Sequence, residues 1–259
     1  GEATAPTMAD IRRRWKPGAP VAGLTFYRTH VQAGNLAAVD ALIDGLRRQG
    51  LNPLPVAVAS LKDPAAAGLL SLAFREAPPD VILNGTAFAV GRPGGDKSGE
   101  TGPTCVLDEA DCPVLQVVFS GGTESAWREG SVGLSPRDIA MNVAMPEVDG
   151  RILTRAVSFK AELRRHAATE SWVLAYRPVA DRVDFVVKLA ANWARLRNAA
   201  PAERRVAMVL ANYPNRDGRI ANGVGLDALA GTVTTLQALA AAGYRVDGAP
   251  ANGAALADD

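Results

Sequence analysis

Short apolar runs alternate with amphipathic segments along the first half of the chain, and this alternation restricts the possible folds more than any other property of the sequence. The amphipathic segments, near residues 36–46 and 64–74, have apolar side chains at helical spacing. The apolar runs have the length and composition of buried strands and cover residues 21–27, 54–59, 80–84 and 114–119. Such alternation is typical of parallel sheets with helices on both faces. We therefore predict an α/β protein with a Rossmann-like or flavodoxin-like parallel sheet.

The second half of the chain starts a similar pattern again. A short helix is predicted from Ser135, ending at Pro146, and is followed by a strand at 152–159 and a long helix at 179–199. A strand at 205–213, a helix at 226–239 and a strand at 244–246 then form one more strand–helix–strand unit, which cannot bury a sheet by itself.

These patterns predict four parts and a chain that is a fragment of a longer protein. The parts are an extended lead-in at 1–20, a first α/β domain at 21–150, a connecting helical segment at 151–203 and the truncated start of a second α/β domain at 204–259.

Composition excludes several classes of function. The net charge is +1, from 28 basic and 27 acidic residues, so charge does not suggest a nucleic-acid partner. No run of about 18 apolar residues suggests a membrane span, and the N-terminus lacks the apolar core of a signal peptide. Cys105 and Cys112 have six residues between them and no histidine close by, which does not fit a zinc knuckle. We expect free thiols and a cytoplasmic protein.

Polar and glycine-rich segments follow the third and fourth predicted strands, at 85–104 and 119–127. Ligands bind outside the carboxyl ends of parallel strands, so this edge is the predicted binding edge. Asn84, Thr86 and Gln116 lie at it and are candidate ligand contacts. The stretch GRPGGDKSG resembles a phosphate loop, but Asp96 stands directly before Lys97-Ser98, where it would repel a phosphate. A ligand loop or lid is the preferred interpretation.

Candidates for acid–base or metal chemistry are few. His30 follows the first strand at the predicted binding edge, where imidazole can move protons or bind a metal, although an isolated histidine is more often structural. Glu147 and Asp149 form a carboxylate pair in PEVDG. Asp149-Gly150 is a favoured turn pair, whereas two carboxylates on a positioned loop also suit acid–base work or metal coordination.

The segment ANYPNRDGRIANGVGLD, residues 211–227, has no nucleophile but several polar side chains. Asp217 between two arginines could simply shape a turn. Alternatively, arginine forks bind ligand carboxylates, with asparagines assisting. The residues concerned are Asn212, Arg216, Asp217, Arg219 and Asn222.

Charge is uneven along the chain. Residues 76–149 contain twelve acidic and four basic residues, whereas residues 151–205 contain twelve basic and five acidic residues. Runs of this kind are usually solvated faces, but the basic stretch could also meet an acidic partner or ligand.

Several motifs together resemble a known family. QVVFSGGTESAWREG, SPRDIAMNVAMPEVDGRILTRAVSFK and ANYPNRDGRIANGVGLD look like the large subunit of aerobic cobaltochelatase, which is similar to the magnesium-chelatase H subunit. The resemblance runs from about Val21 to Gly248. It implies a subunit that binds the tetrapyrrole hydrogenobyrinic acid a,c-diamide and Co²⁺ as substrates. It also implies two partner subunits, one an AAA+ ATPase, with ATP and Mg²⁺ on the partners and not on this chain.

The resemblance assigns roles to the candidates. Inserting a metal requires removal of protons from the macrocycle nitrogens and of water from the metal. Glu147 is the first candidate for the base or metal-delivering carboxylate, and His30 is the second. Arg28, Arg216 and Arg219 would hold the carboxylates and amides at the ring's rim.

Three other interpretations stay open at this stage. The chain could be a non-catalytic scaffold that docks the ATPase partners through 151–205, or the equivalent region of a magnesium-chelatase H subunit. A Rossmann-type transferase for a nucleotide sugar is the third, against which the unsuitable phosphate loop counts. The fragment alone is expected to be inactive.

Overall fold

The computed structural model describes residues 6–91, 105–211 and 225–258. The chain divides into two compact units, Gly1–Arg197 and Asn198–Asp259, and each is described by itself.

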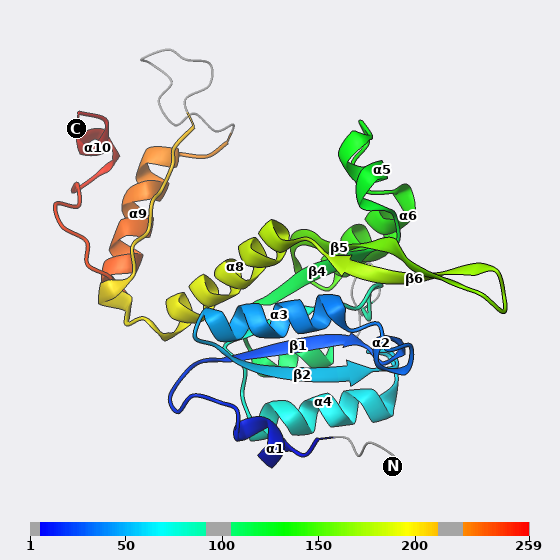
Figure 1. Cartoon of the computed structure of the whole chain (residues 1–259). Coiled ribbons are helices and arrows are strands. Elements are labelled where there is room, and N and C mark those ends of the chain that lie inside the picture. The colour runs from blue at the N-terminus through cyan, green and yellow to red at the C-terminus, as the bar shows by residue number, and fades with distance from the viewer. Residues whose placement is uncertain (1–5, 92–104, 212–224, 259) are drawn as a thin grey trace. The chain divides into compact units, whose positions relative to one another are not determined.

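The first unit is built on one six-stranded sheet (Figure 1). Its strands lie in the order β2-β1-β3-β4-β5-β6; β1 to β5 are parallel and β6 is antiparallel to β5. The order 2-1-3-4-5 is that of flavodoxin-like folds, which confirms the predicted α/β class. The strands are β1 Val21–Tyr27, β2 Asn52–Val58, β3 Val81–Asn84, β4 Val114–Ser120, β5 Ile152–His166 and β6 Ser171–Pro178.

Helices cover both faces of this sheet. Helices α3 (Ala37–Arg48) and α8 (Ala180–Asn198) lie on one face, and α4 (Pro64–Glu76) lies on the other (Figure 1). The face under α3 and α8 holds the larger core cluster, and α4 closes a second cluster. Asp63 caps α4 by accepting a hydrogen bond from the Ala65 amide, with Pro64 in the first turn. The patterns that predicted α3 and α4 thus correspond to real core-facing helices.

The N-terminal segment is not purely extended as predicted. Helix α1 (Met8–Arg12) forms because Thr7 and Asp10 make a reciprocal capping box at its start. Trp15 then donates a hydrogen bond of 3.0 Å from its indole nitrogen to the Pro53 carbonyl. Met8, Ile11 and Trp15 pack against the core cluster beneath α4, so this segment is part of the first unit's packing.

Residues 151–203, predicted as a connecting helical segment, contain α8 but also two strands. The first half of β5 pairs with β4, where Val157 and Phe159 are buried. Its second half, with the polar sequence AELRRH, pairs only with β6, and the two strands continue past the rest of the sheet as an arm (Figure 1). Mutual hydrogen bonding sustains these polar residues as strand without burial, so hydrophobic periodicity could not reveal them.

The helix predicted from Ser135 does not end at Pro146. It runs as α6 (Pro136–Ile139), a π-helical turn η2 (Ala140–Ala144) and α7 (Met145–Val148). The Met145 amide donates to the Ala140 carbonyl, five residues back. Pro146 has no N–H and cannot make the usual helical hydrogen bond. The π turn accommodates this loss, and the helix continues for one more turn. The described residues of the unit also form two short helices, α2 (Thr29–Gln32) and α5 (Glu124–Glu129), and a 3₁₀ turn η1 (Val106–Ala110).

The second unit contains helices α9 (Ala228–Ala241) and α10 (Gly253–Asp258) and a 3₁₀ turn η3 (Pro201–Glu203). The predicted strand at 244–246 and the described part of the other, 205–211, are not strands. A strand needs a hydrogen-bonded neighbour, and residues 205–211 and 244–246 have no strand pairing. Residues 212 and 213 lie outside the described residues, and a second α/β domain from 204 stays a prediction.

Both cysteines are free thiols, and Cys105 is buried. Burial raises the pKa of Cys112 to about 12, which keeps it protonated at neutral pH. Within the described ranges, no helix has both the length and the apolar character needed to cross a bilayer.

Candidate functional site

A cavity of about 370 Å³ lies outside the carboxyl ends of β1, β3 and β4. It occupies the switch point of the fold, because β1 has its successor β2 on one side and β3 on the other. The segments after β1, β3 and β4, the start of the 136–148 helix and the β5–β6 arm all contribute to its wall. We call this cavity the switch pocket; its lining includes Tyr27, His30, Phe88, Phe119, Asp138 and Tyr176.

His30 lies in the switch pocket, as its position after the first strand predicted. Its ring centroid is 5.3 Å from those of both Phe119 and Tyr176. Burial lowers the pKa of His30, and a hydrogen bond with the backbone of Asn35 opposes this only in part. A neutral imidazole is therefore favoured, which is the form that can accept a proton or bind a metal.

Asp138 is a pocket residue that the sequence analysis did not identify. Its buried carboxylate accepts hydrogen bonds from the Ser120 hydroxyl at 2.7 Å, the Gly121 amide at 3.1 Å and the Asn142 side chain at 3.2 Å. The carboxylate thereby joins the segment after β4 to the 136–148 helix. The available signal was the helix-start pattern S-P-R-D at residues 135–138, since Asp138 is the residue whose amide Ser135 caps.

Residues 85–91, which we call the β3 loop, are fixed by hydrogen bonds at nearly every amide. Gly85 donates to the Thr25 carbonyl at 2.8 Å and Ala87 donates to the Tyr27 hydroxyl at 3.0 Å. Only glycine fits at position 85, because a Cβ there would lie 2.9 Å from the Phe119 ring.

Phe88 has an unusual backbone conformation within this loop. Its φ is +67°, in the left-handed region that bulky residues rarely occupy. Such strain costs on the order of 1–3 kcal/mol and persists only where surrounding contacts determine the conformation. Here the Phe88 amide donates to the Met141 carbonyl in the π turn at 2.8 Å. Phe88 is 43% exposed and forms part of the switch-pocket wall.

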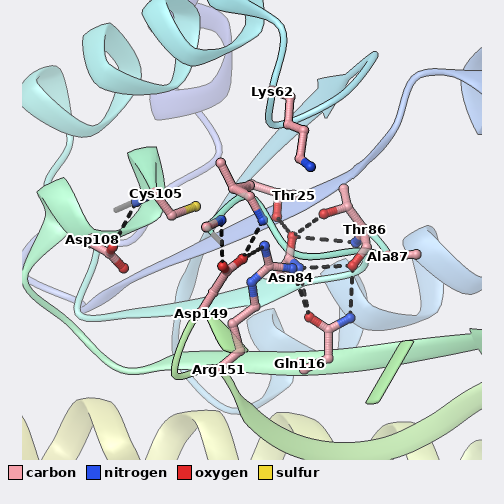
Figure 2. Close-up of polar contacts among 12 residues, drawn as sticks. Thr25, Lys62, Asn84, Thr86, Ala87, Cys105, Asp108, Gln116, Asp149 and Arg151 are labelled. Carbon is pink, nitrogen blue, oxygen red and sulfur yellow. Dashed lines mark hydrogen bonds and ion pairs between the residues drawn. The ribbon is translucent and has the colours of Figure 1, made fainter. Parts of the chain in front are cut away.

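A second group of polar side chains at this edge of the sheet is buried, and Figure 2 shows its contacts. The Asn84 side chain accepts from the Thr25 hydroxyl at 2.6 Å and donates to Gln116 Oε1 at 2.8 Å. The Gln116 side chain donates to the Thr86 carbonyl at 2.9 Å. The three predicted contacts Asn84, Thr86 and Gln116 are thus brought together, but they are buried and bonded to one another. This geometry suits a structural role.

Arg151 and Asp149 complete this group, which we call the buried network: Thr25, Asn84, Thr86, Gln116, Asp149 and Arg151. The Arg151 guanidinium contacts Asp149 Oδ2 at 2.6 Å, and both side chains are 1% exposed. Asp149 also accepts the amides of Val90 and Gly91, each at 2.8 Å. The Asp149 carboxylate therefore holds the end of the β3 loop.

The carboxylate pair Glu147 and Asp149 is separated by the fold. Asp149 turns inward to Arg151, whereas Glu147 lies exposed on α7. Only Glu147 is therefore accessible to a ligand. Arg28 is also exposed, at the start of α2. The predicted rim-binding residues Asn212, Arg216, Asp217, Arg219 and Asn222 lie outside the described residues.

The described part of the chain contains no group of three or more His, Cys, Asp or Glu side chains placed to hold a metal ion. Among the described residues that line the switch pocket, His30 is a side chain that can accept a proton or bind a metal. The aromatic wall of the pocket suits a ligand with a flat, partly apolar surface.

Comparison with known proteins agrees with the resemblance seen in the sequence. The family model described as CobN/Magnesium Chelatase matches residues 2–259. The aerobic cobaltochelatase subunit CobN of Sinorhizobium sp is 53% identical over 92% of this chain and 18% of its own length, and that of Pseudomonas aeruginosa is 46% identical over 96% and 20%.

A solved structure, the catalytic subunit of cobaltochelatase from Mycobacterium tuberculosis, matches with a TM-score of 0.76 and 34% identity over 94% of this chain and 20% of that chain. The chain thus spans about a fifth of the length of these relatives. The extent of the family match and the identities show that the chain belongs to the CobN/magnesium chelatase family.

Proposed function

We propose that this chain forms part of the ring-binding and metal-inserting site of an aerobic cobaltochelatase large subunit. Its substrates would be hydrogenobyrinic acid a,c-diamide and Co²⁺, and its place would be the cytoplasm. ATP and Mg²⁺ would act on the two partner subunits, one an AAA+ ATPase. The single observation that carries the proposal is the switch pocket, which combines aromatic rings with a neutral histidine at the fold's usual ligand edge.

Each reacting group has a chemical task in this proposal. The ring nitrogens must lose protons before they bind Co²⁺, so a base must reach them. Glu147 is exposed on the helix that also supplies Met141 and Asn142 to the pocket wall, and it acts as the base or delivers the metal. His30, kept neutral by burial, accepts a proton or binds the metal in transit.

The arginines would recognise the rim of the ring. Guanidinium groups make paired hydrogen bonds with carboxylates, and Arg28 is exposed at the end of β1. Arg216 and Arg219, with Asn212, Asp217 and Asn222, would add contacts from the 211–227 segment. In this proposal Asn84, Thr86 and Gln116 support the wall and do not contact the ring.

The experiment is a titration of the chain with hydrogenobyrinic acid a,c-diamide, followed by tryptophan fluorescence and the visible spectrum of the ligand. Saturable binding is expected. Glu147→Gln should leave ring binding and the unfolding midpoint nearly unchanged, because an exposed substitution changes stability by about 0.5 kcal/mol or less.

Co²⁺ insertion by the assembled chelatase carrying Glu147→Gln should fall by about 100-fold or more, as expected when a general base is lost. The matched control is Glu129→Gln, because Glu129 is also an exposed glutamate but lies on α5. A chelatase that carries this substitution should insert Co²⁺ normally. Equal insertion by the Glu147 and Glu129 variants would remove Glu147 from the mechanism.

A scaffold role is the second candidate, and the basic stretch at 151–205 favours it. Some of these basic side chains make contacts within the first unit and are less available to a partner. Arg151 pairs with Asp149, and the Arg155 guanidinium lies 3.6 Å from the Phe185 ring centroid. A folded chain that binds no ring but binds the ATPase partner, less tightly as salt rises, would support the scaffold role instead.

A further inference from the structure

The strained conformation of Phe88 is stabilised from several directions. The loop amides on both sides of it are bonded, to Tyr27 through Ala87 and to the Asp149 carboxylate through Val90 and Gly91. The Phe88 amide itself is bonded to the Met141 carbonyl. The surroundings therefore force the left-handed backbone, and a stable loop of this shape exists only at the cost of strain.

The π turn explains why the Met141 carbonyl is available. In an ordinary α-helix this carbonyl would accept the Met145 amide, but that amide is bonded to Ala140. The next residue, Pro146, has no amide hydrogen. The Met141 carbonyl thus faces the β3 loop without a donor from either residue, and Phe88 supplies one.

Phe88 keeps this strained backbone without becoming buried. The residue is 43% exposed and lines the switch pocket, so much of it is not used in packing. The neighbouring rings of His30, Phe119 and Tyr176 contact one another, whereas Phe88 has no ring contact with any described residue. Among the described residues, no other aromatic ring therefore competes with a ligand for stacking on Phe88.

We propose that Phe88 is a positioning residue whose ring stacks on the flat face of a conjugated macrocycle bound in the switch pocket. This proposal rests on the proposed function and adds the contact that orients the ring. Offset stacking suits two flat π-systems, and a rigid loop holds the aromatic group in place before the ligand arrives. Strain retained at an exposed aromatic side chain is the pattern expected where binding, and not folding, uses the residue.

The test separates binding from stability. Phe88→Gly removes the ring and relieves the strain, because glycine adopts positive φ freely. The midpoint of urea unfolding should therefore stay the same or rise, while the dissociation constant for hydrogenobyrinic acid a,c-diamide rises by about tenfold, which corresponds to about 1.4 kcal/mol. Phe88→Tyr should restore binding to within about twofold of the original chain, since it keeps the aromatic face.

Phe88→Leu keeps apolar bulk without a π-system and should bind nearly as weakly as the glycine variant. Phe185→Leu is its matched control, an exposed phenylalanine on α8, and should bind like the original chain. Unchanged ring binding by Phe88→Gly would overturn the proposal and leave the proposed function intact. A glycine variant that loses stability together with binding would also overturn it, by showing a structural role. Absence of ring binding by the unmodified folded chain would overturn both.

Discussion

The buried network and the switch pocket lie at the same edge of the sheet but use polar groups in opposite ways. In the network, Asn84 and Gln116 are bonded to each other and to neighbouring groups, and the Arg151–Asp149 pair is closed to solvent. In the pocket, His30 is only half-buried and the Phe88 ring is open to a ligand. The residues at this edge therefore form two groups. Those of the buried network support the pocket wall, and those of the switch pocket are accessible to a ligand.

The largest effect is expected from breaking the ion pair of the network. Arg151→Met removes the partner of a buried carboxylate, and an uncompensated buried charge costs about 3–5 kcal/mol. Urea unfolding should detect this loss. Arg155→Met, which removes a cation–π contact with Phe185, is the control and should cost about 1 kcal/mol or less. If both variants lost a similar free energy of unfolding, the buried ion pair would contribute no more to stability than the Arg155–Phe185 contact.

A smaller effect is expected from Thr25→Val, which removes one hydroxyl from the network. Asn84 Oδ1 loses its 2.6 Å bond from Thr25 but still accepts the Thr86 hydroxyl at 2.9 Å. The loss in unfolding free energy should therefore be about 1 kcal/mol. Thr29→Val, exposed at the start of α2, should change it by about 0.5 kcal/mol or less. A loss above that of Arg151→Met would reverse the proposed ranking within the network.

The smallest effect should come from the pocket and should depend on pH. Burial lowers the pKa of His30 in the folded chain, so the unfolded chain takes up the proton first as pH falls through about 6.5. The contribution of the neutral histidine to stability is complete above that pH and is lost as pH falls toward the lowered folded pKa. His30→Gln should therefore lose less stability than the original chain between about pH 7 and 5.

Urea midpoints measured at each pH give this comparison. His30→Phe, which keeps an aromatic ring beside Phe119 and Tyr176, should show the same reduced dependence as His30→Gln. If both variants keep the full acid sensitivity of the original chain, His30 is not the group that titrates there.

Much of the first unit was predictable because its signals are local. Apolar runs marked β1 to β4, and helical spacing marked α3, α4 and α8. The polar half of β5 was not predictable, because its strand hydrogen bonds come from β6. Pro146 predicted a helix end, but a π turn lets the helix continue past it. That turn leaves the Met141 carbonyl without a helical donor, and the amide of Phe88, distant in sequence, donates to it.

The candidate site was predictable in place but not in detail. The rule that ligands bind at the carboxyl ends of parallel strands directed attention to His30, which lies in the switch pocket. The same rule selected Asn84 and Gln116, whose side chains are used by the network. The sequence did not indicate Asp138 or Phe88 as site residues. The burial of the Asp138 carboxylate and the positive φ of Phe88 depend on neighbours that are distant in sequence.

Local patterns in the sequence predict the α/β class and the edge of the sheet at which the switch pocket lies, and the sequence motifs indicate the family. These depend on periodicity, strand order and residue identity along the chain. Which polar groups at that edge stay accessible to a ligand depends on the tertiary structure. Glu147 and Asp149 are two residues apart and chemically alike, yet Asp149 meets Arg151 inside the protein and Glu147 meets solvent. Burial and hydrogen-bond partners come from packed neighbours, and packing exists only once the chain has folded.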